Sequence, residues 1–389
     1  MNFRQKLRKN KTIRSLSSVK LAVVCLILLF ILTYWGTIAQ VHQGLYIAQE
    51  RFFESFFFLV LGFIPFPGAQ LVMWVLFVNL ACVALTRLIY KWRNTGIIII
   101  HFGLMLFLIS GYIVLHGSQE SSLTLYEGQS SNVSRAYHDW EIAVWEAGKD
   151  ENSLRYTRKV TAIDAGGLRT AQDINFSQLG FQLTVKNFYR NCLAYAGPVD
   201  ARKILNTSGI QRLQQADLEK EPEKNIPGGI FTIQPKEGKK FDLLLYGNED
   251  VPFSFKAGGK NYAIMLRQAR YPLPFQLKLI DFMMEQYPGT DTPRSFKSQV
   301  AINTNNAWRE KLISMNNPLR DKEFTLYQSS YQIDKMGNEA STLAVVKNRG
   351  RILPYAATFV TFAGLVIHFI MMAFTSKRKF ESPYVDEGK

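Results

Sequence analysis

Hydrophobic positions along the chain gather into four long runs, three near the N-terminus and one near the C-terminus. About 20 consecutive apolar residues cross a bilayer as a helix, and a helix satisfies its own backbone polar groups in lipid. The pattern therefore predicts a membrane protein with four transmembrane helices in a three-plus-one arrangement. The predicted segments are an N-terminus (1–20), helix 1 (21–39), a loop (40–70), helix 2 (71–90), a loop (91–96), helix 3 (97–115), a large domain (116–352), helix 4 (353–374) and a tail (375–389).

A shorter apolar run, Phe52–Pro65, lies in the loop 40–70. It contains Glu54 and leads into the breaker sequence Pro65-Phe66-Pro67-Gly68. Because it is too short and too interrupted for a span, we interpret it as an interfacial helix.

Basic residues orient the predicted spans. Seven Lys/Arg precede the first span, three lie between residues 87 and 93, and Lys377-Arg378-Lys379 follows the last span. By the positive-inside rule, both termini and the loop 91–96 are cytoplasmic, and the loop 40–70 and the domain 116–352 are extracytoplasmic. We therefore expect a multi-pass protein of the bacterial inner (plasma) membrane, with the first span an uncleaved anchor.

The net charge of +15 has little to do with the large domain. Residues 117–350 hold 30 Lys/Arg against 26 Asp/Glu, a net +4, so most of the excess lies beside the spans. This distribution disfavours a nucleic-acid partner and favours contact of residues 1–20 with anionic lipids of the bilayer. Three cysteines, with Cys192 alone in the domain, allow no disulfide there and no Cys-x-x-Cys redox centre. We expect Cys192 to be a buried apolar residue.

The domain 116–352 reads as all-β and sandwich-like. Short β-branched and aromatic runs alternate with turn signals, and Gly258-Gly259 joins two runs as a hairpin. Helical composition is confined to Ile210–Glu221 and, for a turn or two, Asp281–Gln286. The glycine pairs at 166–167 and 228–229 are also predicted to be hairpin turns rather than nucleotide-binding loops.

Two similar segments raise the question of two related β units. Phe181-Gln182-Leu183-x-Val185-x-x-Phe188 recurs 94 residues later as Phe275-Gln276-Leu277-x-Leu279-x-x-Phe282. Both copies are predicted to be core strands. Internal duplication and the ordinary alternation of two half-buried strands explain the match equally well.

Two of the five histidines, His101 and His368, lie within predicted spans. An ionisable group inside a bilayer suggests a function, and imidazole is a ligand of haem iron. A rise of about 1.5 Å per residue places the two roughly 6 and 9 Å from the inner ends of their spans, in the same leaflet. If helices 3 and 4 are neighbours, the two rings could share a ligand.

The alternative is a histidine that hydrogen-bonds across to another helix. We favour this alternative for His368. For His101 the two are balanced, because the small residues around it could leave space for a flat cofactor. These small residues are Gly96, Gly103, Ser110 and Gly111.

Elsewhere the chemistry is sparse. His42 and His116 could form a second pair near the outer surface, although solvated side chains are the simpler interpretation. His138 has no second histidine or cysteine near it in sequence for a metal site. No catalytic residues are predicted, and an enzyme with its own active site is not visible.

Several segments, in order along the chain, resemble the ResB family of cytochrome c biogenesis proteins. In the membrane segments they are Gly36-Thr37-Ile38, Asn79-Leu80-x-Cys82 with Arg87, and His101-x-Gly103 leading to Ser110-Gly111. In the domain they are Leu277-x-Leu279-Ile280-Asp281-Phe282, Tyr287-Pro288-Gly289, Pro293-x-Ser295-Phe296-x-Ser298, Asn316-Asn317-Pro318-Leu319 and Leu326-Tyr327-Gln328-Ser329-Ser330-Tyr331. An ordered set of segments is more specific than any single motif.

The resemblance implies the non-catalytic half of a haem lyase, a system II cytochrome c synthetase. Such a subunit holds haem b in transit and helps to deliver it to apocytochrome c for thioether attachment. His101 matches the family's transmembrane haem ligand and would be the metal-binding residue, through the haem iron; His368 is a second, weaker candidate. A CcsA-type membrane partner would supply the opposing histidine and a tryptophan-rich segment, and the six tryptophans here form no such segment.

Two other interpretations stay open. The chain could be a scaffold or chaperone that docks apocytochrome or stabilises the partner without binding haem. A transporter-associated permease is more remote, because those we know place one span before the large domain and three after it, the reverse of the order here.

Overall fold

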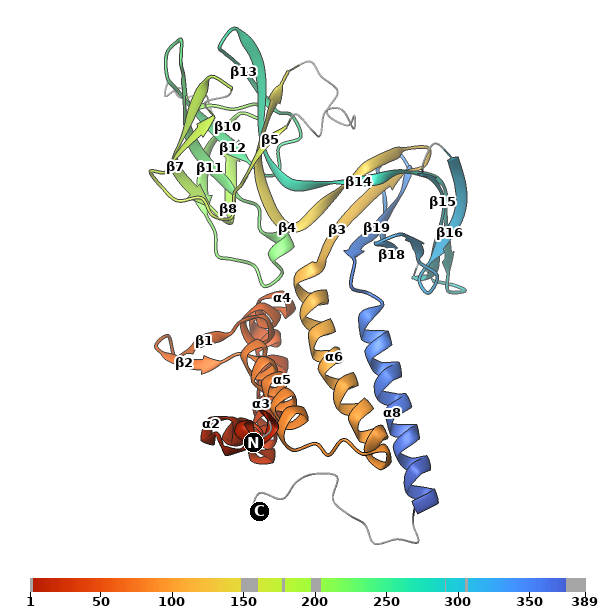
Figure 1. Ribbon diagram of the computed structural model, residues 1–389. Helices are drawn as coiled ribbons and strands as arrows, with labels where there is room; N and C mark the ends of the chain where they lie inside the picture. The colour runs from red at the N-terminus through yellow and green to blue at the C-terminus, as the bar shows by residue number, and fades with distance from the viewer. Residues whose placement is uncertain are drawn as a thin grey trace. The chain divides into compact units, whose positions relative to one another are not determined.

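The computed structural model describes residues 3–147, 160–176, 179–196, 204–290, 292–304 and 307–375. The chain divides into two compact units (Figure 1). One, the membrane unit, comprises Met1–Ser118 and Asn348–Lys389, and the other, the β unit, comprises Gln119–Lys347. The basic run Lys377–Lys379 lies outside the described residues.

Among the described residues of the membrane unit, four helices are long and apolar enough to cross a membrane: α3 (Val19–Gln43), α5 (Ala69–Thr86), α6 (Thr95–Gly117) and α8 (Leu353–Thr375). They confirm the three-plus-one arrangement and a multi-pass membrane protein. The other elements of this unit are α1 (Phe3–Lys9), α2 (Lys11–Leu16), α4 (Leu45–Gln49), the π-helix η1 (Glu50–Glu54), strands β1 (Phe57–Val60) and β2 (Ile64–Pro67), and the 3₁₀-helix η2 (Trp92–Asn94).

The prediction of an interfacial helix over Phe52–Pro65 is wrong. Helical structure ends at Glu54, and β1 and β2 form an antiparallel hairpin with Phe57 opposite Pro67. Pro65 and Pro67 lack the amide hydrogens that a helix interior needs, and Gly62 adopts a φ of 82° in the turn. These residues favour a ribbon over a helix.

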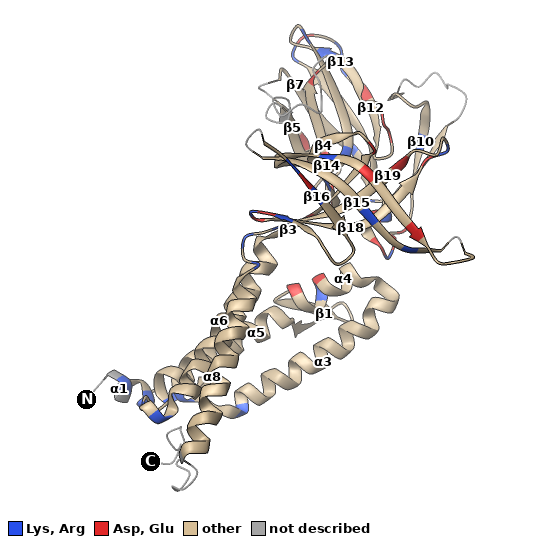
Figure 2. Cartoon of the chain, turned by 90° about the vertical axis from the view of Figure 1, so that its right-hand side faces the viewer, with Lys and Arg blue, Asp and Glu red and all other residues tan. Residues whose placement is uncertain are grey.

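The N-terminal segment is tied to the C-terminal end of α5. The Arg4 guanidinium donates to the carbonyls of Ala84, Leu85 and Leu88, and Arg8 donates to Thr86 O at 2.6 Å. The last carbonyls of a helix lack partners within it and carry its negative dipole end, which favours cations there. Figure 2 shows Lys and Arg gathered at this end of the helices.

Asn79 makes a second tie between the N-terminal segment and α5. Its Nδ2 donates to Leu16 O and Ser18 O at 2.6 and 2.9 Å, and the residue is 2% exposed. This polar residue in an apolar helix therefore fixes the turn between α2 and α3.

The β unit is built from strands, as predicted. They are β3 (Ser118–Tyr126), β4 (Ser130–Glu146), β5 (Thr161–Asp164), β6 (Asp173–Phe176), β7 (Phe181–Tyr189), β8 (Cys192–Ala196), β9 (Ile204–Leu205), β10 (Ile210–Gln215), β11 (Gly228–Pro235), β12 (Phe241–Tyr246), β13 (Phe253–Ala257), β14 (Lys260–Gln286), β15 (Pro293–Thr304), β16 (Ala307–Ser314), β17 (Leu319–Asp321), β18 (Phe324–Ile333) and β19 (Glu339–Asn348), with a 3₁₀ turn η3 (Pro222–Lys224).

The largest sheet has the order β16-β15-β14-β4-β3-β19-β18-β17, with β13 paired to β14 and β5 paired to β4. A second sheet has the order β6-β7-β11-β12-β9, and β8 and β10 form a separate ribbon. The predicted hairpin at Gly258-Gly259 joins β13 to β14, with Ala257 opposite Lys260.

Two main hydrophobic cores fill the β unit. One lies between the five-stranded sheet and the first half of β14, around Phe181, Phe231 and Ile264. The other lies between the second half of β14 and strands β15–β19, around Leu277 and Leu326. The two similar sequence segments are core strands, as expected, and each belongs to a different core.

Three local predictions in the β unit are wrong. Ile210–Gln215 is strand β10, whose Ile210 and Leu213 are buried at a helix-like spacing because a bulge interrupts the strand. Asp281–Gln286 continues β14, and a bulge at Leu279/Asp281 explains its irregular periodicity. Gly228 and Gly229 lie within β11, where added side chains would meet Cys192 and the backbone of Asn187.

Candidate functional site

Helices α6 and α8 pack against each other through small residues. A Cβ on Gly96 would lie 2.5 Å from the backbone nitrogen of His368, and one on Gly364 would lie 2.8 Å from the nitrogen of Ile100. A Cβ on Gly103 would overlap Thr361. Glycine therefore allows the two backbones to approach closely, as in many membrane helix pairs.

This close contact between α6 and α8, called the seam below, explains the small residues around His101. Gly96, Gly103 and Ser110 recur every seven residues and are all buried. The space beside the first two is filled by α8, so they provide helix contact rather than a cofactor slot. Gly111 differs, because nothing lies within 4 Å of a Cβ built there.

His101 lies on another face of α6. At 3.6 residues per turn it is about 140° around the helix from Gly96 and about 160° from Gly103. It shares a stripe with Leu108, Tyr112 and Leu115, at spacings of 7, 11 and 14 residues. His368, whose backbone abuts Gly96, belongs to the seam with α8. The third and fourth spans are thus neighbours, yet their histidines belong to different faces.

A hydrogen bond sets the orientation of the His101 ring. Its Nδ1 lies 2.9 Å from the carbonyl oxygen of Ile97, one turn earlier in α6. A carbonyl can only accept, so Nδ1 carries the hydrogen and Nε2 of the neutral ring carries the lone pair. Metal-binding histidines use this same arrangement, in which one nitrogen donates to a carbonyl and the other binds the metal.

Toward the C-terminal end of α6, the His101 stripe faces α5. Gln70 of α5, which is 3% exposed, places its Nε2 2.7 Å from Nε2 of His116. Tyr112 contacts both His116 and Trp74, with its ring centroid 4.4 Å from that of His116 in a tilted arrangement and 5.2 Å from that of Trp74 in an edge-on arrangement. His116 is itself exposed, and it is bonded to α5 within the membrane unit through this contact.

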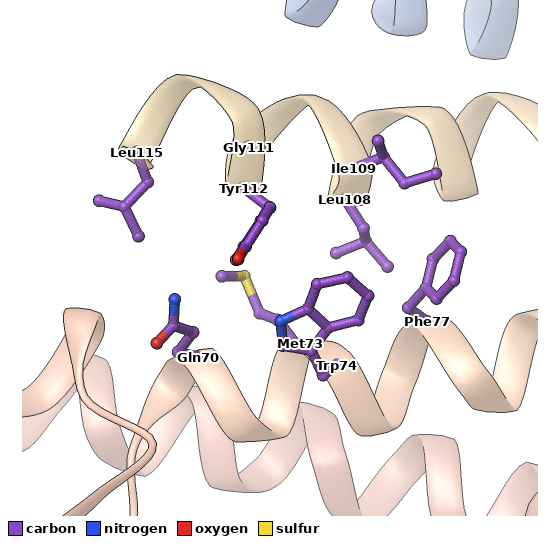
Figure 3. Close-up of a pocket in the computed structure, with 9 residues that line it drawn as sticks. All are labelled: Gln70, Met73, Trp74, Phe77, Leu108, Ile109, Gly111, Tyr112 and Leu115. Atoms are coloured by element: carbon purple, nitrogen blue, oxygen red, sulfur yellow. The ribbon is translucent and has the colours of Figure 1, made fainter. Parts of the chain in front are cut away.

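A small cavity adjoins this polar pair (Figure 3). It is lined by Gln70, Met73, Trp74, Phe77, Leu108, Ile109, Gly111, Tyr112 and Leu115, and its volume is about 30 Å³. Sites for drug-sized ligands measure roughly 300–1,000 Å³. A porphyrin does not fit there.

The remaining candidates do not assemble into a site among the described residues. His42 is exposed near the end of α3, and His138 lies 3.7 Å from Glu223. The described part of the chain has no group of three His, Cys, Asp or Glu residues that could hold a metal ion. Cys192 is 1% exposed, and burial raises the pKa of its thiol to about 11, which confirms the prediction of a buried apolar residue.

Sequence reasoning missed Gln70, which no motif marks. Its one signal is position: an amide at the start of an apolar span is costly to bury unless it is paired. The β unit has a comparable group, in which Ser298 Oγ donates to Gln328 Oε1 at 2.7 Å and also lies 2.7 Å from Ser341 Oγ. Ser298 and Gln328 were noted only as parts of family-like segments.

These features define a multi-pass membrane protein with a large β unit. Residues 251–346 match the model of the ResB-like family. This range begins just before β13 and ends within β19, so it covers the second core of the β unit apart from Leu123 and Leu125 of β3. The resemblance to ResB proteins is thereby confirmed.

The chain is also distantly homologous to Protein NrfI of Wolinella succinogenes. The two are 32% identical over 168 residues, which are 42% of this chain and 16% of NrfI. The chain therefore spans a small part of the length of that relative.

Proposed function

We propose that the chain is a subunit of a system II cytochrome c synthetase in the bacterial inner membrane. In this role it holds haem b in transit with a CcsA-type partner and helps to deliver it to apocytochrome c. Both termini would be cytoplasmic and the β unit extracytoplasmic, as the basic residues beside the spans indicate.

The geometry of His101 carries the proposal. The residue lies in a candidate membrane span, and its Nδ1–H donates to Ile97 O, so that Nε2 presents the lone pair. Nε2 of His101 would bind the haem iron, and the chain would supply half of the haem site. We leave His368 out of the ligand set, because its backbone forms part of the α6–α8 seam.

The partner would complete the site. With one histidine from each subunit holding the iron, the site would suit custody of haem rather than oxygen chemistry. The vinyl groups of the haem would react with the thiols of apocytochrome c. This chain would contribute an oriented imidazole and an apolar wall that keeps water away from it.

The test is His101→Gly in the chain purified with its partner. We expect loss of a six-coordinate low-spin absorption spectrum at unchanged yield of the complex, and recovery of the spectrum when imidazole is added. His42→Gly is the matched control, because His42 is exposed on α3 and should leave the spectrum unchanged. An unchanged spectrum in His101→Gly would overturn the ligand assignment, as would a loss that imidazole does not restore.

A scaffold that binds no haem is the second candidate. It is favoured by the position of the family match, which lies in the β unit and not around His101. It predicts wild-type haem content in His101→Gly and loss of partner assembly when residues 121–347 are removed.

A further inference from the structure

The β1–β2 hairpin has apolar side chains on both faces. On one face, Phe58 is buried against Trp35 of α3 and Phe52 of η1, with ring centroids 5.8 and 4.8 Å away. On the other face, Phe57 and Leu59 are 61% and 54% exposed. A ribbon with one face in water normally alternates apolar and polar residues. The outer face of this hairpin lacks that alternation.

The turn of the hairpin has an unusual residue. Leu61 adopts a φ of 53° and is 79% exposed, next to Gly62 and to Phe63, which is 72% exposed. Left-handed positions in hairpin turns usually hold Gly, Asn or Asp, because other side chains are strained there. Asn at position 61 would relieve the strain and also be soluble, so a leucine points to an apolar environment around the turn.

The hairpin also carries no charge. From Phe56 to Pro67 there is no Asp, Glu, Lys or Arg. Arg51, at its base, stacks over Phe52 and Phe58 and donates to the carbonyl of Leu59. Figure 2 shows charged residues beside α4 and none on β1.

We propose that the hairpin inserts its turn into the interfacial layer of the membrane, in the leaflet that holds the end of α3 and the start of α5. The surface is continuous with the membrane-facing surface of the unit, because Tyr34 and Ile38, beside Trp35 on α3, are 64% and 47% exposed. Figure 1 shows the hairpin projecting from α3 and α5 on the side away from α6.

The depth follows from the backbone. A two-stranded ribbon leaves unpaired N–H and C=O groups along both edges, which hydrocarbon cannot satisfy. Headgroups and their water can, and aromatic side chains are enriched in that layer. The hairpin thus acts as a lateral anchor at the interface rather than as a fifth span.

The experiment measures the depth of a spin label on the full-length protein in nanodiscs of phosphatidylcholine and phosphatidylglycerol. Leu61→Cys is made after Cys25, Cys82 and Cys192 are replaced by alanine. Collisions with oxygen, which concentrates in hydrocarbon, are compared with collisions with a water-soluble nickel chelate. Phe359→Cys, 73% exposed on α8, is the hydrocarbon reference, and Met336→Cys, 89% exposed in the turn before β19, is the aqueous reference.

We expect the oxygen-to-nickel collision ratio at position 61 to be severalfold above that at 336 and below that at 359. Phe63→Cys is the second label site and should give the same ranking if Leu61→Cys is poorly expressed. A ratio equal to that at 336 would place the turn in water and overturn the proposal. Shielding from both reagents would overturn it too, because another protein surface would then cover the hairpin.

Discussion

Helix α6 contacts two other helices in opposite ways. Toward α8 it presents glycine and serine, and the backbones meet so closely that a single Cβ at Gly96 or Gly103 has no room. Toward α5 it presents Leu108 and Tyr112, which leave a cavity of about 30 Å³ beside the Gln70–His116 pair. Small residues therefore mark the tightest contact, and large residues mark the contact with space.

The comparison shows why glycine next to a histidine is a weak sign of a cofactor slot. In a membrane, helices gain little from the hydrophobic effect between them and associate through close packing. Glycine at a seven-residue spacing thus indicates a partner helix first. His101 lies on a different face of α6, away from these glycines.

The largest expected loss of stability concerns the contact of α6 with α8. Gly103→Ala places a Cβ against Thr361, including its backbone nitrogen at 2.8 Å, which cannot move without shifting α8. We expect a loss of stability of about 2 kcal/mol, in the range of overpacked cores. The measurement is the midpoint of SDS-induced unfolding in mixed micelles. Wild-type stability would show that the two helices are not packed backbone to backbone.

A smaller effect is expected on the α5 side. His116→Leu leaves the buried amide of Gln70 without its partner, Gln70→Leu leaves the exposed His116 without its partner, and the double substitution removes both groups. We expect a coupling free energy of about 1 kcal/mol in the double-mutant cycle. The double variant should be more stable than the sum of the two single-variant losses predicts. Strict additivity in the same unfolding assay would mean that the two side chains do not interact.

The smallest change in stability is expected for Gly111→Ala, which distinguishes the face of α6 that contacts α8 from the face that does not. Gly111→Ala is the same chemical change on the same helix as Gly103→Ala, and the new Cβ meets no atom within 4 Å. We expect no loss of stability, and a gain of up to about 1 kcal/mol from the higher helix propensity of alanine. A destabilisation as large as that of Gly103→Ala would remove the distinction between the faces.

Sequence patterns predicted the membrane helices because a bilayer imposes length and apolarity on every span. Their packing was not predictable in the same way. The seam is formed by Gly96, Gly103 and Gly364, but the sequence does not show which of these residues meet across the two helices, and the structure does. The β1–β2 hairpin was missed because an apolar run of this length is compatible with a helix or with a ribbon. Pro65 and Gly62 favour the ribbon that is observed.

In the β unit, strand identity was predictable and strand irregularity was not. The bulge at Leu279/Asp281 shifts the burial pattern so that Phe282 follows Leu279 at a spacing of three, which resembles a helical turn. For the candidate site, the sequence identified His101, but its tautomer depends on a contact with Ile97 O that no motif encodes. Gln70 was missed because its partner His116 is 46 residues away.

Strand β14 runs through both cores and pairs along its length with β4, from Tyr262 opposite Glu146 to Lys278 opposite Ser130. The family match at 251–346 includes β14 but not β4. A fragment cut to the match would therefore expose a long, unpaired, apolar strand edge, the kind of surface that aggregates. We therefore expect that the region delimited by homology does not fold independently, and that soluble expression of this part of the chain requires a start before Ser130.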